Sequence, residues 1–170
     1  MKNFMALWAF MLVMSFTANS QQVEFEEYDL ENGLHVILHQ DNSAPVITVG
    51  VMHDVGGKDL GGDNNPERTG FAHFFEHLLA SGPTENIEKG TWRKIRAANG
   101  GSGNANTSLD RTYYYQSFPS DKLELALWME SERLLHPIID QDAVDTQNEV
   151  VKEEKRMRYD NSPYGQILFA

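Results

Sequence analysis

The order of hydrophobic and polar positions predicts strands at the start of the chain and helices interleaved with more strands later. Residues 23–55 contain two β-rich segments around an Asn32–Gly33 turn, followed by a third segment that is rich in β-branched side chains. Residues 104–118 are rich in Thr and Tyr, and Asp110 in their middle indicates a turn between two further strands. This order favours an α+β fold with an antiparallel sheet packed against helices.

Four segments have apolar residues at helical spacing and end at residues that stop helices. They are residues 71–80 before Ser81–Gly82–Pro83, 86–99 before Gly100–Gly101, 121–136 before Pro137, and 140–161 before Ser162–Pro163. The third helix is predicted to be amphipathic through its leucines, Leu123, Leu127, Leu134 and Leu135. The large apolar side chains of the first helix are predicted to be buried: Phe71, Phe74, Phe75, Leu78 and Leu79.

The composition excludes several classes of function. The chain has 170 residues, of which 41% are hydrophobic and 23% charged, the balance of one globular domain or part of one. With 14 basic and 25 acidic residues the net charge is -11 and no basic cluster is present, so nucleic acid is a poor partner. The absence of Cys excludes disulfides, thiolate metal sites and a Cys nucleophile. Any bound metal must therefore be held by His and carboxylate side chains.

Residues 1–20 have the pattern of a secretory signal peptide. A positively charged start precedes an apolar run of twelve residues, and the small residues Ala18 and Ser20 form a cleavage site. The run is too short for a stable membrane span, which predicts that the mature chain, residues 21–170, is exported. The alternative is an N-terminal anchor that is not cleaved.

Residues 71–80 are apolar at every position except His73, Glu76 and His77. Spacings of three and four residues bring these side chains into one narrow sector of a helix. A Glu buried beside two His is costly because an isolated charge loses its hydration, and a metal ion removes that cost. Two His at i and i+4 can bind one Zn²⁺, and the Glu before the second His can reach a water on the metal. This is the H-x-x-E-H zinc motif; the alternative is a hydrogen-bonded His pair with a surface Glu.

A zinc hydrolase needs a third protein ligand and an open fourth position. The candidates on the last predicted helix are Glu149, Glu153 and Glu154. Glu154 follows two valines by one turn and precedes Met157 by three residues, whereas Glu153 shares its stripe with charged residues. Helical phase therefore selects Glu154 as the inward carboxylate. The remaining histidines lack comparable partners and are interpreted as ordinary strand or helix-end residues: His35, His39, His53 and His136.

The HFFEH motif at residues 73–77, with Glu154 downstream, resembles the inverzincin metallopeptidases of family M16. This is the family of pitrilysin, insulin-degrading enzyme and mitochondrial processing peptidase. The resemblance extends over residues 23–166 and is greatest to bacterial secreted members with short M16 domains. Three stretches carry most of it: residues 69–78, 100–113 and 149–156.

The resemblance implies a zinc-dependent endopeptidase that hydrolyses bonds in peptides or unfolded segments through a metal-activated water. It implies one zinc per chain, held by His73, His77 and Glu154, with Glu76 as the general base. The implied fold is an α+β sandwich, of which two copies form each half of a clamshell. A second M16 domain or a partner chain is therefore expected, and a bacterial member would work in the periplasm or after secretion.

The resemblance also implies a substrate-binding edge. In the family, peptides add as a strand to an exposed sheet edge, and the matching positions are Gly103, Asn104, Ala105, Asn106 and Thr107. A segment rich in Gly, Asn and Ser with free backbone groups is an available template for such strand addition. The alternative for this stretch is a plain edge loop.

The chain departs from the family in two places. Many members carry a Glu two turns before the metal-binding Glu, where this chain has Gln147, which can hydrogen-bond a ligand but adds no charge. The pattern also stops at residue 170, before the rest of the first domain and before the Arg and Tyr that the family uses on the substrate carbonyl. We therefore expect residues 21–170 to be the zinc-binding N-terminal portion of an M16 domain, from a truncated or fragmentary reading frame.

Two other functions are compatible with the pattern. A non-catalytic M16-like subunit or peptide-binding module would keep the fold, but such subunits typically lose the motif residues that are intact here. A zinc-binding structural domain would close its site with a fourth protein ligand, and the sequence offers no convincing candidate.

Overall fold

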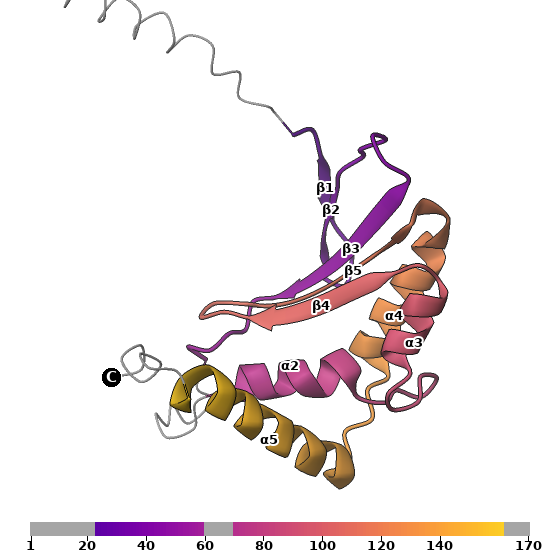
Figure 1. The fold of residues 1–170 in the computed structure, drawn as a ribbon. Coiled ribbons are helices and arrows are strands. Elements are labelled where there is room, and N and C mark those ends of the chain that lie inside the picture. Colours follow the sequence, from indigo (N-terminus) through magenta and orange to yellow (C-terminus); the bar gives the residue numbers. More distant parts are fainter. Residues whose placement is uncertain (1–22, 60–69, 162–170) are drawn as a thin grey trace, which may run out of the picture. The chain divides into compact units, whose positions relative to one another are not determined.

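The computed structural model describes residues 23–59 and 70–161 (Figure 1). The predicted signal peptide, residues 1–20, and the predicted helix stop at Ser162–Pro163 lie outside these residues. The chain divides into two compact units, residues 1–44 and 45–170, which are described separately. No helix in the two described ranges is both long enough and apolar enough to cross a membrane.

The first unit contains a β-hairpin. Strand β1 (Glu26–Asp29) pairs antiparallel with β2 (His35–Leu38). The turn is closed by the Leu30 N–H, which donates to Leu34 O at 2.9 Å. Gly33 has a φ of 85°, a left-handed conformation that glycine adopts without strain, so the predicted Asn-Gly turn is confirmed.

The second unit is built on a three-stranded antiparallel sheet. Its strands are β3 (Val46–His53), β4 (Ser102–Thr107) and β5 (Thr112–Pro119), in the order β3-β5-β4. The two strands predicted around Asp110 are thus confirmed. Alternate side chains of the central strand are buried, as the period of two requires: Thr112, Tyr114, Gln116 and Phe118. Strand β4 pairs only with β5 among the described residues, which makes β4 an edge of this sheet.

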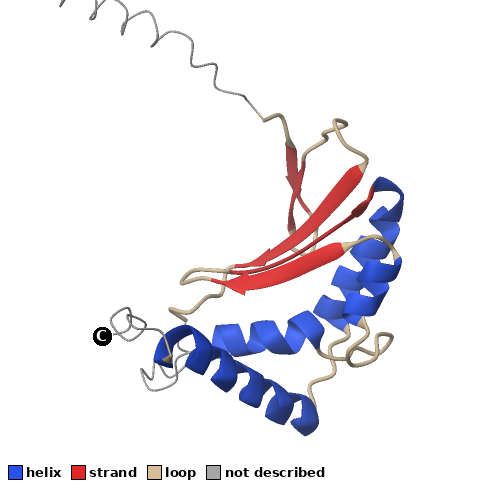
Figure 2. Ribbon diagram, in the orientation of Figure 1, coloured by secondary structure: helices blue, strands red, loops and turns tan. Residues whose placement is uncertain are grey.

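The helices of the described ranges pack with this sheet (Figure 2). They are α2 (Phe71–Ser81), α3 (Trp92–Ala98), α4 (Leu123–Leu135) and α5 (Gln141–Lys155). A 3-10 turn (Ser120–Lys122) precedes α4, and a π-helical turn, η2 (Arg156–Asp160), continues α5. Helices α2, α3 and α4 lie along one face of the sheet, and α5 packs on α2 (Figure 1). The predicted α+β class with an antiparallel sheet is therefore confirmed.

Local sequence signals account for several helix ends. Helix α5 begins at Asp140, whose carboxylate accepts a hydrogen bond from the Ala143 N–H at 2.8 Å. Helix α3 ends in a Schellman motif, in which Gly100 has a φ of 69° and the Gly101 N–H donates to Arg96 O at 2.8 Å. The core beside these helices is formed by Ile87, Trp92, Phe118, Ala126 and Met129.

Helix α3 is shorter than predicted. The apolar spacing of residues 86–99 predicted one helix, but the helix begins only at Trp92. Gly90 has a φ of 77°, which a continuous right-handed helix does not allow. The Trp92 side chain is fully buried, and its Nε1–H donates to Gly82 O at 2.6 Å. The burial of this large side chain decides where the helix starts.

The leucine face of α4 is turned outward, which corrects the prediction of an apolar face against the core. Leu127 and Leu135 are 52% and 72% exposed, and Leu123 and Leu134 are exposed as well. The buried face carries both apolar and charged residues: Ala126, Met129, Glu130, Glu132 and Arg133. The charged residues can be buried because each one has hydrogen-bond partners inside the protein.

Candidate metal centre

The two motif histidines lie one turn apart on α2 and face each other. His73 Nε2 and His77 Nε2 are 3.1 Å apart, and the rings are nearly perpendicular, with centroids 4.7 Å apart. Both side chains are partly buried between α2 and α5. The i, i+4 spacing predicted this shared helix face, and the structure shows it.

Glu154 brings a third ligand atom to the same point from α5. Its Oε2 lies 3.1 Å from His77 Nε2 and 3.4 Å from His73 Nε2, although His77 and Glu154 are 77 residues apart in sequence. Ligand atoms about 2.0–2.1 Å from a tetrahedral Zn²⁺ lie about 3.3–3.4 Å from one another. The three measured separations fit one face of such a tetrahedron.

The donor set also fits zinc chemically. Two imidazole nitrogens and one carboxylate oxygen form the type of three-ligand set that catalytic zinc sites use. Among the described residues, the group of potential ligands contains His73, His77 and Glu154 and no fourth His, Asp or Glu. Three ligands leave one position open, as chemistry at the metal requires and as a closed structural site does not.

The neighbouring glutamates of α5 point elsewhere. Glu153 is 56% exposed at its side chain and pairs with Arg156 at 2.9 Å, while Glu154 is 18% exposed. Glu149 is also exposed and pairs with Lys152 at 2.9 Å, which lowers the pKa of its carboxyl. Of the three candidate carboxylates, only that of Glu154 meets the histidines.

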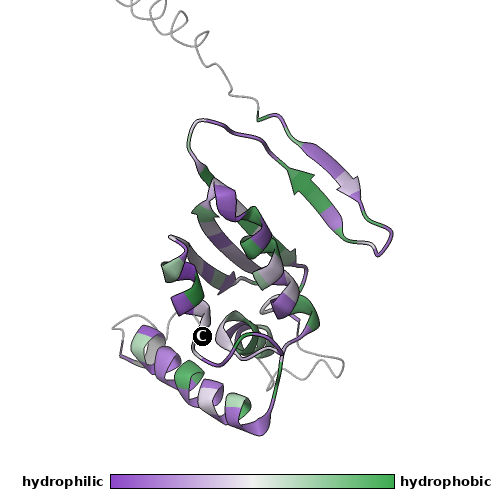
Figure 3. Ribbon diagram, turned by 90° about the vertical axis from the view of Figure 1, so that its right-hand side faces the viewer, coloured by the Kyte–Doolittle hydropathy of each residue, from purple (hydrophilic) through white to green (hydrophobic). Residues whose placement is uncertain are grey.

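The reason for this orientation differs from the predicted one. An apolar inward stripe was expected to turn Glu154 toward the interior, but Val150 and Met157 on that stripe are exposed. Figure 3 shows α5 as a mostly hydrophilic helix with a few hydrophobic bands. Contact with α2, rather than an apolar stripe, therefore sets the rotation of α5.

Glu76 is held separately from the three converging atoms, by strand β4. Its carboxylate is buried, and its Oε2 accepts a hydrogen bond from Thr107 Oγ1 at 2.6 Å. Thr112 Oγ1 lies 3.2 Å from Thr107 Oγ1 and donates to Val55 O at 2.8 Å. Because a carboxylate only accepts and each hydroxyl has one proton, Thr107 donates its proton to Glu76 and Thr112 donates its own to Val55 O, which leaves the longer contact between the two hydroxyls without a proton.

The predicted substrate-binding positions form most of edge strand β4. Gly103, Asn104, Ala105, Asn106 and Thr107 are in extended conformation, so this stretch is a strand and not the plain loop considered as an alternative. A Cβ at Gly103 would lie 2.7 Å from Tyr115 O, so glycine allows the close strand pairing there. The Asn106 side chain accepts a hydrogen bond from Arg111 Nη1 at 2.8 Å.

Gln147 lies two turns before Glu154 on the same helix and is half-buried. Among the described residues, no hydrogen bond joins its side chain to the two histidines or to Glu154. Two other contacts to the site were not foreseen: the Thr107 hydroxyl on Glu76, and Arg158 on Glu154. The contact between Thr107 and Glu76 depends on how the sheet pairs, which the sequence does not show. The contact between Arg158 and Glu154 could have been predicted, because a spacing of four residues places both side chains on one helix face.

The remaining histidines do not join the metal-ligand group. His35 pairs with Asp29 at 2.8 Å, and His136 pairs with Glu85 at 3.2 Å. His39 Nδ1 lies 2.6 Å from Glu24 O. The hydrogen bond to Asp29 raises the pKa of His35.

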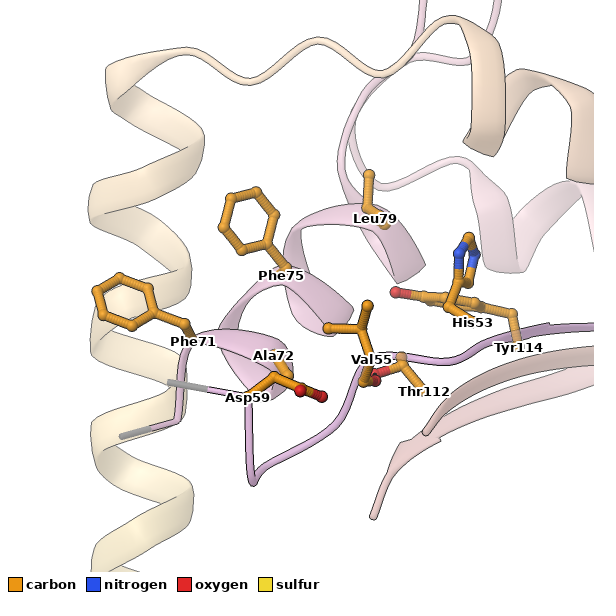
Figure 4. A pocket seen from close by; sticks show the side chains of 9 residues that line it. All are labelled: His53, Val55, Asp59, Phe71, Ala72, Phe75, Leu79, Thr112 and Tyr114. Atoms are coloured by element: carbon orange, nitrogen blue, oxygen red, sulfur yellow. The ribbon is translucent and has the colours of Figure 1, made fainter. Parts of the chain in front are cut away.

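The opposite side of α2 borders an apolar cavity of about 300 Å³ (Figure 4). Phe71 and Phe75, which were predicted to be buried, line it and are about half exposed. His53 also lines the cavity, and its Nε2 is buried without a hydrogen-bond partner among the described residues. Desolvation lowers the pKa of His53 and raises that of Tyr114 beside it. Helix α2 thus carries the motif histidines on one side and the lining of an apolar cavity on the other.

Residues 35–168 match the family model described as insulinase, peptidase family M16. The chain belongs to peptidase family M16. This M16 chain is 33% identical over 156 residues to zinc protease PqqE of Helicobacter pylori, covering 91% of this chain and 34% of that protein. It is 27% identical over 131 residues to human insulin-degrading enzyme, covering 77% of this chain and 12% of that one.

Solved structures agree with this assignment. The M16 chain superposes on the crystal structure of a protease from Helicobacter pylori with a TM-score of 0.78 and 32% identity, covering 85% of this chain and 34% of that one. Pitrilysin shares the fold, with a TM-score of 0.68 and 24% identity over 82% of this chain and 14% of that one. The chain thus spans about a third of the length of its Helicobacter relatives.

Proposed function

We propose that this M16 chain supplies the metal centre and general base of a zinc-dependent endopeptidase that acts on peptides or unfolded segments. The observation that carries the proposal is the convergence of His73 Nε2, His77 Nε2 and Glu154 Oε2 within 3.1–3.4 Å of one another. Membership of a family with relatives named as zinc proteases supports the same metal. We further propose one zinc per chain.

His73, His77 and Glu154 would hold the zinc ion, which would supply Lewis-acid chemistry for the activation of water and of a substrate carbonyl. Two residues of the chain, Glu76 and Thr107, carry out and position the proton transfer. Glu76, one position before a ligand and buried, takes the proton of the attacking water and returns it to the leaving amine. Thr107 holds the Glu76 carboxylate through its 2.6 Å hydrogen bond and so limits the orientations available to the base.

Strand β4 is the proposed binding edge for the peptide. Its backbone pairs with β5 on one side, and its other side has no strand partner among the described residues. A peptide added there would run past Thr107 and therefore past the Glu76 carboxylate. Gln147 is not proposed as a metal ligand; its role would be to form a hydrogen bond to a ligand, without adding charge.

Full peptidase activity is proposed to need a second M16 domain or a partner chain in addition to this chain. Because this chain spans about a third of its Helicobacter relatives, we propose that a second M16 domain or partner chain covers the substrate and supplies donors for the developing oxyanion. We also propose export, on the signal-peptide pattern of residues 1–20. A non-catalytic peptide-binding module is the second candidate, favoured by the open edge of β4, and disfavoured by the intact motif residues.

The test combines metal content with hydrolysis of an unfolded peptide, measured with and without a partner M16 chain. Wild type should contain about one zinc per chain. Glu76→Gln should keep the zinc and abolish hydrolysis, whereas His77→Ala should lose both. Loss of zinc in Glu76→Gln with retention in His77→Ala would contradict the assignment. Full activity of the chain without a partner would refute the proposed assembly, and binding of peptide without any hydrolysis in either setting would favour the non-catalytic module.

A further inference from the structure

Arg158 contacts the carboxylate of the metal-ligand group from the side away from the histidines. Its Nη2 lies 2.5 Å from Glu154 Oε1, whereas the other oxygen, Oε2, lies 3.1 Å from His77 Nε2. The two oxygens of one carboxylate therefore have different partners. One is held by the guanidinium, and the other faces the point where the ligand atoms converge.

The backbone after α5 brings Arg158 to this position. Arg158 follows Glu154 by four residues, a spacing that puts both side chains on the same helix face. The π-helical turn η2 continues the helix, and the Asn161 N–H donates to Arg156 O at 2.9 Å, a wider turn than that of an α-helix. The contact is thus built into the end of the helix that carries the third ligand.

A carboxylate without such a contact can rotate, or can present both oxygens to a metal. Either change removes the single-oxygen arrangement that leaves a position open beside the two histidines. An Arg on Oε1 restricts both, because a guanidinium forms directional, charge-assisted hydrogen bonds to a carboxylate. Gln147, two turns before Glu154 on the same helix, carries no charge that could act in the same way.

The positive charge of Arg158 also opposes a bound cation, so two effects compete. The Arg158 side chain is 63% exposed, while the Glu154 side chain is 18% exposed. Solvent and salt screen the repulsion between the exposed cation and a metal. The ion pair with Arg158 lies at the partly buried carboxylate of Glu154 and is screened less, so orientation prevails over repulsion.

We propose that Arg158 is a positioning residue of the metal centre, which holds Glu154 so that Oε2 alone faces the metal and thereby raises zinc affinity. The inference rests on the proposed zinc site but not on peptidase activity. Hydrogen-bond partners of metal ligands typically contribute about 10–100-fold to metal affinity. The same range is expected for Arg158.

The chain offers a matched control. Arg156 lies two residues earlier, is also exposed, and pairs with Glu153 at 2.9 Å rather than with a ligand. Removing it changes the net charge of the same helical end by the same amount. A general electrostatic effect on zinc would appear in both variants, whereas a positioning effect would appear only at Arg158.

The experiment is a zinc-affinity measurement on the full chain by competition with a chromophoric chelator, using zinc alone as the ligand. Arg158→Ala should bind zinc about 10–100-fold more weakly than wild type. Arg158→Lys should recover part of the loss, because Lys retains the charge without the planar fork. Arg156→Ala should stay within about twofold, since it does not contact a ligand. Circular dichroism of each metal-free variant checks folding, and Arg158→Gln replaces Arg158→Ala if the latter does not fold.

Equal affinities for Arg158→Ala and Arg156→Ala would overturn the inference, as would tighter zinc binding by Arg158→Ala. A wild-type chain that does not bind zinc would overturn both the inference and the proposed function. Zinc binding that depends on Arg158, in a chain that shows no hydrolysis even with its partner, would support the inference and refute the proposed function.

Discussion

Two clusters of buried or partly buried polar side chains adjoin α2, and they are built differently. The first, which we name the closed cluster, consists of Gln116, Glu130 and Arg133. Glu130 accepts from Gln116 Nε2 at 2.7 Å and from Arg133 Nε at 3.0 Å, while Arg133 Nη1 donates to Leu79 O at 2.5 Å. The charges of this cluster are therefore paired within the protein, and the pairing ties α4 to α2.

Aromatic rings complete the surroundings of the closed cluster. The Arg133 guanidinium lies over the ring of Trp92 at 4.5 Å and over that of Tyr114 at 4.8 Å. Cation–π contacts of this kind add to the paired charge in a desolvated site. These contacts stabilise one folded arrangement, and Gln116 Oε1 is the one atom of the cluster that is buried without a hydrogen-bond partner among the described residues.

The second, which we name the open cluster, consists of His73, Glu76, His77 and Glu154. Its three ligand atoms lie against one another: two histidine nitrogens and a carboxylate oxygen meet within 3.4 Å. The comparison teaches that burial of charge alone does not indicate a functional site. What distinguishes the open cluster is that its polar atoms converge on one point and keep bonding capacity there.

The largest expected effect comes from breaking the closed cluster. Arg133→Met should lower the free energy of unfolding by about 3–5 kcal/mol, because it leaves the Glu130 carboxylate buried without its cation. Urea denaturation followed by circular dichroism measures the change. The double variant Glu130→Leu with Arg133→Met should lose much less, since it leaves no unpaired charge. Equal losses in the single and double variants would show that the pairing is not what stabilises this cluster.

The next effect concerns which carboxylate belongs to the open cluster. Glu154→Ala should weaken zinc binding by more than about 100-fold, beyond the range typical of a ligand's outer partner, because it removes a ligand. Glu153→Ala should change the affinity by less than about twofold, since its partner is the exposed Arg156. Chelator competition measures both. The reverse result would mean that α5 is rotated by one residue in solution.

A smaller effect is expected where the open cluster meets β4. Thr107→Val should lower the free energy of unfolding of the metal-free chain by about 1–3 kcal/mol, because the buried Glu76 carboxylate loses its hydroxyl donor. Thr107→Ser keeps a hydroxyl and should restore most of the stability. Urea denaturation of the three proteins is the measurement. Identical stabilities for the Val and Ser variants would mean that the hydrogen bond contributes nothing.

The smallest effect is a pH dependence at His53, outside both clusters. Burial lowers its pKa below 6.5, Arg133 lowers it further, and Glu130 partly offsets this. The unfolded chain therefore binds the proton more strongly than the folded chain. The contribution of neutral His53 to the free energy of unfolding is fully present above about pH 6.5 and is lost as the pH decreases below that value. His53→Gln should show a smaller loss between about pH 7 and pH 5 in urea denaturation. A larger loss of stability in the variant would mean that folding raises the pKa of His53 and does not lower it.

Much of the local structure follows from the sequence alone. Asn32–Gly33 predicted the hairpin, and Gly100 predicted the end of α3, because these depend on the backbone preferences of a few adjacent residues. The alignment of His73 and His77 on one helix face followed from their spacing for the same reason. Interactions within about one turn of chain are encoded by neighbours and need no knowledge of the fold.

Only the tertiary structure decided which faces of the helices are buried. The leucines of α4 predicted an inward apolar face, yet the buried face holds Glu130 and Arg133, whose partners come from β5 and α2. The carboxylate of Glu154 meets His77 because α5 packs on α2, while Val150 and Met157 of the apolar stripe that predicted this orientation are exposed. Periodicity describes the sides of one helix, but the choice between them depends on partners far away in sequence, whose hydrogen bonds and packing outweigh the hydrophobicity of a single face.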